Sequence, residues 1–207
     1  MKKSDLDKFF LEVEKRLQQP VKIYLTGGVL AWFYGGVRPT LDIDFALKTG
    51  GKWEEASRVL REVGQKLGIP LEYSEDISRW GVIGYSNFTE GARLYKKFGA
   101  LSVYTLDPLI WSVGKLSRYT ADDLSDLIAV FKKQKPDPDK AVQVWIQALL
   151  ESPRSTEHHL FVKKVEDFLS FHGKEIWGRA FDFEKRIEDF RTKLSATEMK
   201  GEDRVKK

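Results

Sequence analysis

Two glycines and two aspartates are the residues of this chain whose types and spacing could carry out chemistry. Gly27 and Gly28 end the apolar run Val21–Leu25, and thirteen residues separate Gly28 from Asp42, which is followed by Asp44. Glycine has no Cβ, so its backbone N–H groups can approach a phosphate closely. Carboxylate oxygens together with substrate phosphates are what Mg²⁺ prefers. Phosphate and metal together predict nucleotidyl transfer.

Three short elements must position these residues. Val21–Leu25 is β-branched and aromatic and predicts a strand. The apolar run 29–34 predicts a helix that starts just after Gly28, where free N–H groups and the helix dipole favour an anion. Leu41–Leu47 predicts a second strand.

Strand alternation should place the two aspartates together. Asp42 and Asp44 fall on one face of the second strand, and the odd-numbered residues from Leu41 to Leu47 fall on the other, apolar face. Two adjacent carboxylates repel each other unless a cation lies between them. Taken alone, Gly-Gly is also typical of an ordinary turn, and Asp-x-Asp of a solvated strand face.

The order of these motifs resembles the nucleotidyltransferase superfamily to which DNA polymerase beta belongs. That superfamily has Gly followed by Gly or Ser, a gap of about nine to thirteen residues, and then Asp-apolar-Asp/Glu-apolar; Gly27, Gly28, Asp42 and Asp44 fill these positions. The motif Arg38-x-Thr40-x-Asp42-Ile43-Asp44 is similar to the sequences of the minimal, stand-alone branch of this superfamily. That branch includes the nucleotidyltransferase-like toxins of abortive-infection and toxin–antitoxin systems and related uncharacterised proteins. The resemblance implies that Arg38 and Thr40 bind nucleotide.

A second block carries the resemblance further, so that it covers roughly residues 20 to 133. Families of this branch often carry Lys-Leu, Arg and Asp-x-x-Asp, and this chain has Lys115, Arg118, Asp123 and Asp126. The resemblance implies that Lys115 and Arg118 bind nucleotide phosphates and that Asp126 is catalytic. Two alternatives stay open: Lys115 as a surface lysine, and the aspartates as helix-dipole partners in a first turn.

Polymerase-like members also have a third carboxylate, and no second Asp-x-Asp occurs here. Glu72, Asp76 and Asp107 are the candidates. Glu72 lies in a predicted strand, Leu71 to Ser74, and completes the expected metal set with Asp42 and Asp44, whereas Asp107 more simply caps the helix that follows it. Without a third carboxylate, the chain would bind a nucleotide without transferring it.

Composition excludes several other classes of protein. The 207 residues include no cysteine, so disulfides and thiolate metal sites are excluded. No apolar run approaches the length of about 20 residues needed to cross a bilayer. We therefore expect no membrane partner and a cytoplasmic location. The net charge of +4 permits an RNA or nucleotide partner.

The order of elements predicts an α/β (α+β) nucleotidyltransferase-like core with a small mixed sheet, followed by a helical C-terminal half. We expect the core and its N-terminal helix, starting at a Ser4 cap, in residues 1–106, a helical region in 107–195 and a charged flexible tail in 196–207. From Asp107 onwards the periodicity predicts helices only; the expected ranges are 108–118, 121–133, 139–150, 155–171 and 174–194.

These observations lead to one functional hypothesis and one alternative. The hypothesis is an enzyme that uses Mg²⁺ or Mn²⁺ to move a nucleoside monophosphate from an NTP, expected to be ATP, to a hydroxyl of RNA, tRNA or protein. The alternative is a nucleotide-binding or interaction module with weak or no catalysis, for example one member of a toxin–antitoxin pair with a cognate antitoxin as its partner.

Overall fold

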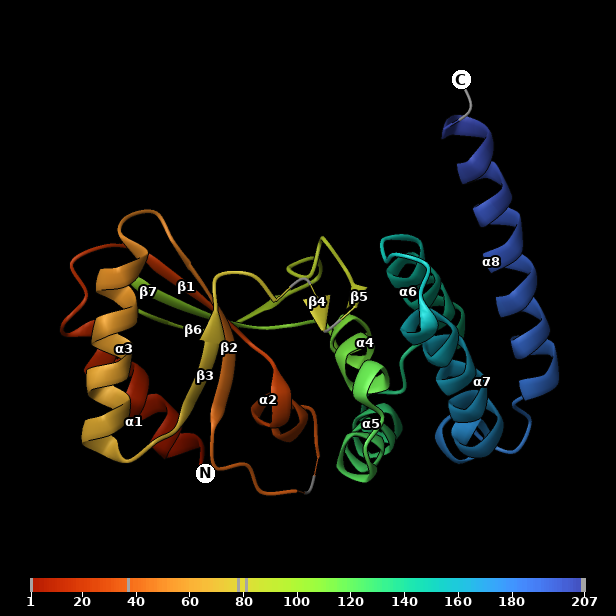
Figure 1. Cartoon of the computed structure of the whole chain (residues 1–207). Helices are drawn as coiled ribbons and strands as arrows, with labels where there is room; N and C mark the ends of the chain where they lie inside the picture. Colours follow the sequence, from red (N-terminus) through yellow and green to blue (C-terminus); the bar gives the residue numbers. More distant parts are fainter. Residues whose placement is uncertain (1, 37, 78, 81, 206–207) are drawn as a thin grey trace. The chain divides into compact units, whose positions relative to one another are not determined.

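The computed structural model describes residues 2–36, 38–77, 79–80 and 82–205. Over these residues it has eight helices and a five-stranded mixed sheet, which confirms the mixed α/β class (Figure 1). The chain divides into two compact units. The first contains residues 1–77 and 88–107, and the second contains residues 78–87 and 108–207. Residues 78–87, expected in the core, therefore group with the helical half.

The first unit is built on the five-stranded sheet, whose strand order is β3-β2-β1-β7-β6. The central strand β1 pairs antiparallel with β2 and parallel with β7; β2 pairs parallel with β3, and β6 pairs antiparallel with β7. The strands are β1 (Val21–Leu25), β2 (Ile43–Thr49), β3 (Leu71–Ser74), β6 (Arg93–Phe98) and β7 (Leu101–Thr105).

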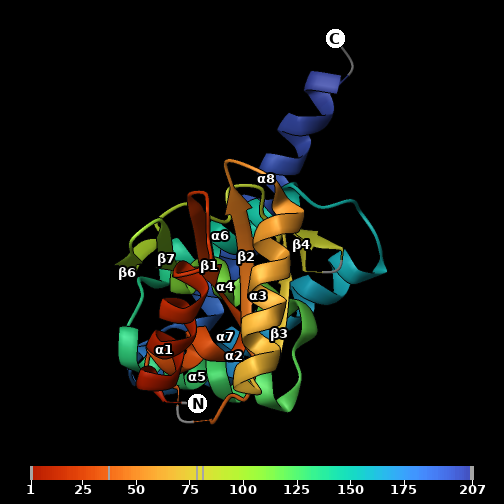
Figure 2. The same ribbon diagram turned by 90° about the vertical axis from the view of Figure 1, so that its left-hand side faces the viewer.

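Helices α1 (Lys3–Glu14) and α3 (Trp53–Leu67) cover one face of this sheet (Figures 1 and 2). Both helices are amphipathic and turn their apolar sides towards the strands, so the core lies between them and the sheet. A third, short helix, α2 (Gly27–Phe33), connects β1 to β2. The buried core includes Leu6, Phe9, Phe10 and Val13 of α1, Ile23 and Leu25 of β1, Ile43, Phe45 and Leu47 of β2, Val59, Leu60 and Val63 of α3, and Val103 of β7.

Several element boundaries differ from the sequence-based predictions. The strand β2 begins at Ile43, and Leu41 is 79% exposed, so Leu41 does not extend the apolar face as expected. Ser4 lies inside α1 and does not cap it; Lys2 precedes the helix, and its backbone N–H donates to Asp5 Oδ2 at 2.8 Å. The strand β6 was not predicted, because its three basic residues among six hide any apolar alternation.

The second unit is helical and has its own aromatic core. Phe131 stacks on Trp145 with ring centroids 6.4 Å apart, and Phe168 meets both rings edge-on. A small β-ladder, in which Arg79–Trp80 pairs antiparallel with Ile83–Gly84, belongs to this unit. The elements are α4 (Pro108–Arg118), α5 (Ala121–Gln134), α6 (Pro138–Leu150), α7 (Thr156–Trp177), α8 (Phe183–Val205), β4 (Arg79–Trp80) and β5 (Ile83–Gly84).

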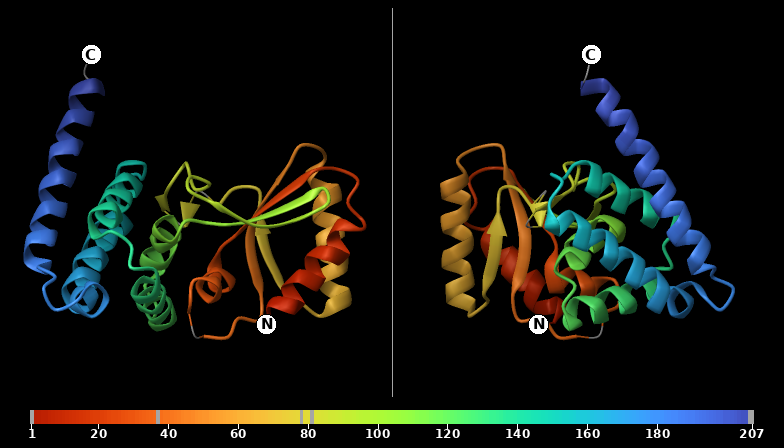
Figure 3. Two further views of the ribbon diagram at one scale, coloured as in Figure 1. Left: turned by 180° about the vertical axis from the view of Figure 1, so that it is seen from behind. Right: turned by 45° about the vertical axis from the view of Figure 1, so that its right-hand side comes forward.

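The last two helices are longer or placed later than expected. The helix α7 continues past Phe171 to Trp177 and ends at Gly178, whose φ of +101° suits glycine. The helix α8 continues to Val205, through most of the segment expected to be a flexible tail (Figure 3); residues 206–207 lie outside the described residues. None of the helices that the structure describes is both long and apolar enough to span a membrane.

Candidate functional site

The end of β1 and the start of β2 are joined where the predicted glycines and aspartates occur. The Thr26 N–H donates to the backbone oxygen of Asp44 at 2.9 Å, which continues the β1–β2 ladder past Leu25. The chain then turns at Gly27, which has a left-handed φ of +58° and is the first residue of α2. Glycine adopts this φ without the steric cost that other residues meet.

The Asp44 carboxylate packs directly on the two glycines. A Cβ added to Gly27 would lie 1.6 Å from Asp44 Oδ2, so any side chain at this position would displace the carboxylate. The Gly28 N–H donates to the same oxygen at 3.3 Å. The glycine pair therefore makes room for Asp44 and also supplies it with a hydrogen bond.

Thr40 links the other aspartate to the same point. The buried Thr40 hydroxyl donates to Asp42 Oδ1 at 2.7 Å. A Cβ on Gly28 would lie 2.9 Å from Thr40 Oγ1 and 3.8 Å from an Arg38 guanidinium nitrogen. The structure thus brings together all of the residues that the first motif supplied: Gly27, Gly28, Arg38, Thr40, Asp42 and Asp44.

A side chain at Gly28 should therefore damage the site more than the fold. We expect Gly28→Val to weaken NTP binding at least about tenfold, because the new methyl groups would push Thr40 away from Asp42 and cover the backbone N–H. The measurement is calorimetric titration with Mg-ATP. Gly50→Val is the matched control, since no atom lies within 4 Å of a Cβ there. Unchanged affinity in a folded Gly28→Val protein would exclude close approach of the ligand at this turn.

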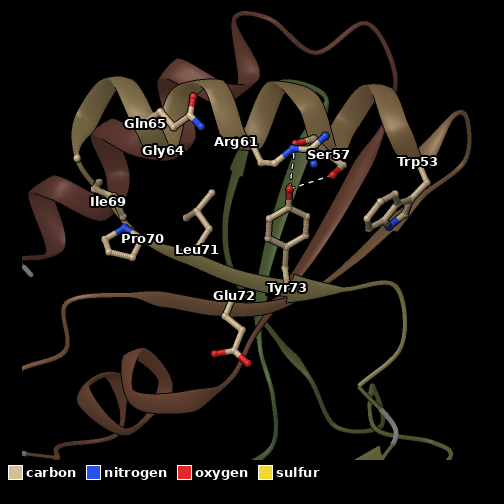
Figure 4. Close-up of a pocket in the computed structure, with 11 residues that line it drawn as sticks. Trp53, Ser57, Arg61, Gly64, Gln65, Ile69, Pro70, Leu71, Glu72 and Tyr73 are labelled. Carbon is tan, nitrogen blue, oxygen red and sulfur yellow. Dashed lines mark hydrogen bonds between the residues drawn. The ribbon is translucent and has the colours of Figure 1, made fainter.

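Glu72 is the candidate third carboxylate that the sheet places beside Asp44. The two residues are paired across the parallel β2–β3 ladder, so their side chains leave the sheet on the same face. Figure 4 shows Glu72 on the side of β3 opposite to Tyr73 and α3. The other two candidates lie elsewhere: the Asp76 backbone oxygen accepts from Ser74 Oγ in the turn after β3, and the Asp107 side chain lies against Gly91.

The carboxylates fit a magnesium ion in part. Asp42 and Asp44 could supply two hard oxygen ligands, and Mg²⁺ commonly completes its shell with water and substrate phosphates. Across the described residues, no group of three acidic, histidine or cysteine side chains converges closely enough to hold a metal. The site therefore fits a metal that binds together with a nucleotide better than a metal held by protein alone.

A groove of about 650 Å³ runs between α3 and the edge strand β3 (Figure 4). Its walls include Trp53, Arg61 and Leu71, and Tyr73 donates from its hydroxyl to the Ser57 backbone oxygen at 3.0 Å. These side chains belong to the helix-covered side of the sheet, whereas Asp44 and Glu72 leave the sheet on the other side. Glu72 also borders this groove, but its carboxylate lies on the side of β3 opposite to Tyr73, so the groove and the carboxylates of the candidate site are on different faces of the sheet (Figure 4).

The second sequence block forms a buried ion cluster inside the second unit. Lys115 is only 2% exposed, and its Nζ lies 2.7 Å from Asp126 Oδ2 and 2.9 Å from Asp123 Oδ1. The same ammonium lies 5.5 Å from the centre of the Trp111 ring. The resemblance implied that the Lys115 side chain binds nucleotide phosphates. In the structure the Lys115 ammonium is paired with two buried aspartates.

Arg118 and Thr120 complete this cluster around Asp123. Arg118 donates to both carboxylate oxygens of Asp123, at 2.7 and 3.1 Å, and Thr120 donates to one of them at 2.9 Å. Burial raises the pKa of Asp123, but the hydrogen bonds and charges of Arg118 and Lys115 outweigh it and lower that pKa to about 2. The Asp123 backbone N–H donates in turn to Thr120 Oγ1, which caps the N-terminus of α5.

The lowered pKa of Asp123 predicts an acid-sensitive fold. A carboxyl whose pKa is lower in the folded state than in the unfolded state stabilises the fold at pH values above its unfolded pKa, here about 3.8. This stabilisation is lost as the pH falls through the folded pKa of about 2. We expect the free energy of unfolding in urea to fall by about 1 to 2 kcal/mol between pH 4 and pH 2 from this group. Asp123→Asn should remove that part of the pH dependence and should be less stable at pH 7. An identical pH profile in the variant would contradict the assignment.

Two tyrosines on the aspartate side of the sheet have no counterpart among the sequence-based predictions. Tyr24 of β1 and Tyr104 of β7 are paired across the parallel ladder, and their rings stack with centroids 5.1 Å apart. The alternations Lys22-Ile23-Tyr24 and Ser102-Val103-Tyr104 place polar and aromatic residues opposite the core. That alternation was the available signal, but only the register shows that the two rings meet.

Comparisons of the chain with protein-family models, with curated proteins and with solved structures found no match. Its function is therefore inferred from the residues of the site.

Proposed function

We propose that this protein is a Mg²⁺-dependent nucleotidyltransferase of the superfamily that its first motif resembles. It would move a nucleoside monophosphate from an NTP, expected to be ATP, to an acceptor hydroxyl and release pyrophosphate. The observation that carries the proposal is the convergence of Gly27, Gly28, Thr40, Asp42 and Asp44 at one end of β1 and β2. A turn that must be glycine and two carboxylates at the same point suit a nucleoside triphosphate with its metal.

Each side chain has a role in this proposal. Asp42 and Asp44 would hold Mg²⁺ or Mn²⁺, which neutralises phosphate charge when bound. The Arg38 guanidinium, near Gly28, would bind phosphate oxygens. Thr40 orients Asp42 through its hydroxyl hydrogen bond. Glu72, in register with Asp44, would accept the proton of the acceptor hydroxyl as a general base.

The hydrogen bond between Gly28 and Asp44 couples the two halves of the site. The Gly28 N–H is donated to Asp44 Oδ2 in this structure. An Asp44 carboxylate that turns towards a metal would release this N–H for a phosphate oxygen. Metal and nucleotide are therefore expected to bind cooperatively.

The second block is not included in the proposed nucleotide site. Lys115, Asp123 and Asp126 satisfy one another's charges within the second unit. Arg118 joins the same cluster through Asp123. Their roles in phosphate binding and catalysis, which the resemblance implied, remain predictions that substitution of Lys115 would test.

The direct test is incubation of the protein with α-³²P-labelled NTPs, Mg²⁺ and bulk cellular RNA or protein. Transfer of label to either acceptor, lost in Asp44→Asn, supports the proposal. No transfer to either, with Mg-NTP binding intact, would support the alternative.

That alternative is a nucleotide-binding or interaction module, for example one member of a toxin–antitoxin pair. One observation favours it: the described residues contain no converging group of three metal-binding side chains. The catalytic reading then depends on Glu72, which only the strand register brings near Asp44. Loss of transfer in Glu72→Gln with unchanged Mg-NTP binding would favour the enzyme.

A further inference from the structure

The sheet face opposite α1 and α3 is organised in three rows that run across the strands. Residues paired between neighbouring strands point to the same side, and residues two apart along a strand do as well. The basic row is Lys48, Lys22, Ser102 and Lys97; the tyrosine row is Ala46, Tyr24, Tyr104 and Leu94; the acidic row is Asp44 and Glu72.

The basic row concentrates positive charge that the first unit does not neutralise. Lys22 and Lys48 are directly opposite each other on antiparallel strands, a placement of like charges that costs stability. Among the described residues, Lys22, Lys48 and Lys97 have no ion-pair partner. By contrast Lys96, adjacent to Lys97 but directed to the other side, pairs with Asp7 of α1 at 2.9 Å. The unpaired lysines therefore favour an external anion.

The tyrosine row places two partly exposed aromatic rings next to these charges. The stacked pair Tyr24 and Tyr104 lies between the basic and acidic rows, and the neighbouring Leu94 is 56% exposed. Phe88 meets the Tyr24 ring edge-on, and the Lys48 ammonium lies 5.5 Å from the centre of the Phe88 ring. Rings of this kind on a sheet are platforms on which unpaired bases stack.

The order of the rows has a direction. Successive rows are two residues apart along a strand, or about 7 Å, so the basic row lies about 13 Å from the acidic row. A chain that crosses the sheet would meet lysines first, then tyrosines, and then the carboxylates of the proposed metal site. Its phosphates would lie beside the lysines, its bases beside the tyrosines, and its reacting end beside the carboxylates.

We infer that this sheet face binds the end of a single-stranded nucleic acid and delivers its terminal hydroxyl to Asp44 and Glu72. The inference rests on the proposed function and assigns its acceptor: a nucleic acid, and not a protein side chain. The lysines contact backbone phosphates, and the tyrosines stack on bases that a duplex would keep paired. A single strand is therefore preferred over a duplex.

The test measures nucleic-acid binding without metal or NTP, so that it is independent of catalysis. Fluorescence anisotropy measures the affinity for fluorescein-labelled single strands of about ten nucleotides and for the corresponding duplexes. RNA and DNA probes are measured in separate arms. Lys22→Gln with Lys97→Gln should weaken binding of the single strand about tenfold near 0.1 M salt and lower the slope of log K against log salt by about 1.4. The control Lys8→Gln with Lys52→Gln removes the same charge from exposed positions outside the rows and should leave binding unchanged.

The tyrosine row is tested by a pair of variants that differ in the ring. Tyr104→Leu should weaken single-strand binding by roughly five- to a hundredfold, whereas Tyr104→Phe keeps the ring and should bind like the wild type. Equal weakening by both lysine pairs, or equal binding by Tyr104→Leu and wild type, would overturn the inference. So would transfer of label to protein only. Intact Mg-ATP binding in the same preparation shows that failure here leaves the proposed function standing.

Discussion

Asp44→Asn is expected to lower the affinity for Mg-ATP by at least about a hundredfold while leaving the protein folded. The substitution removes the charge that a metal requires. In the wild type the Gly28 N–H donates to Asp44 Oδ2 at 3.3 Å. The asparagine side chain keeps a carbonyl oxygen that can accept the same hydrogen bond, so the turn at Gly27 should be preserved. Calorimetric titration gives the affinity, and thermal unfolding checks the fold.

Asp76→Asn is the matched control for this experiment. Asp76 is an exposed aspartate in the turn after β3, where its backbone oxygen accepts from Ser74 Oγ. It should bind Mg-ATP like the wild type. If the two variants bind equally well, the aspartate pair is a solvated strand face and the proposed site is wrong.

Lys115→Met is expected to lower the free energy of unfolding by about 3 to 5 kcal/mol. The change leaves Asp123 and Asp126, each under 4% exposed, without the ammonium between them. Urea unfolding measures the loss, and the exposed Lys133→Met on α5 is the control, expected within about 0.5 kcal/mol of wild type.

A second substitution separates the ion cluster from a nucleotide role. Adding Asp126→Leu to Lys115→Met replaces a buried charge pair with apolar groups, which is often neutral or stabilising, and should restore much of the lost stability. The opposite pattern would be unchanged stability with NTP binding weakened tenfold or more. That result would indicate that Lys115 binds nucleotide phosphates.

The sequence predicted the aspartate site because its parts are close along the chain. Only Thr26 separates β1 from Gly27 and Gly28, Asp44 lies on β2, and the two strands are neighbours. Local patterns sufficed for the exact bounds of β1, β3 and α4 as well. Leu41 was assigned wrongly because alternation alone does not show where a strand begins.

Contacts between distant segments could not be predicted in this way. The role of Lys115 depends on how α4 packs against α5, which brings Asp123 and Asp126 to its ammonium. The three rows likewise depend on the pairing of β1 with β7 and on the register of β6. Helical and strand periodicity give the face on which a residue lies, but not its neighbours on other elements.

The pairing of β1 with β7 also constrains how the chain folds. The central strand β1 has β2 beside it early in the sequence, but its other neighbour begins only at Leu101. During synthesis one edge of Val21–Leu25 therefore stays open until the β6–β7 hairpin has emerged. Such non-local parallel pairing is slow to form, and an open apolar edge can pair with other chains in the meantime. Aggregation during folding should thus be most sensitive to the residues that let this hairpin close, above all its turn at Gly99, which has a φ of +51°.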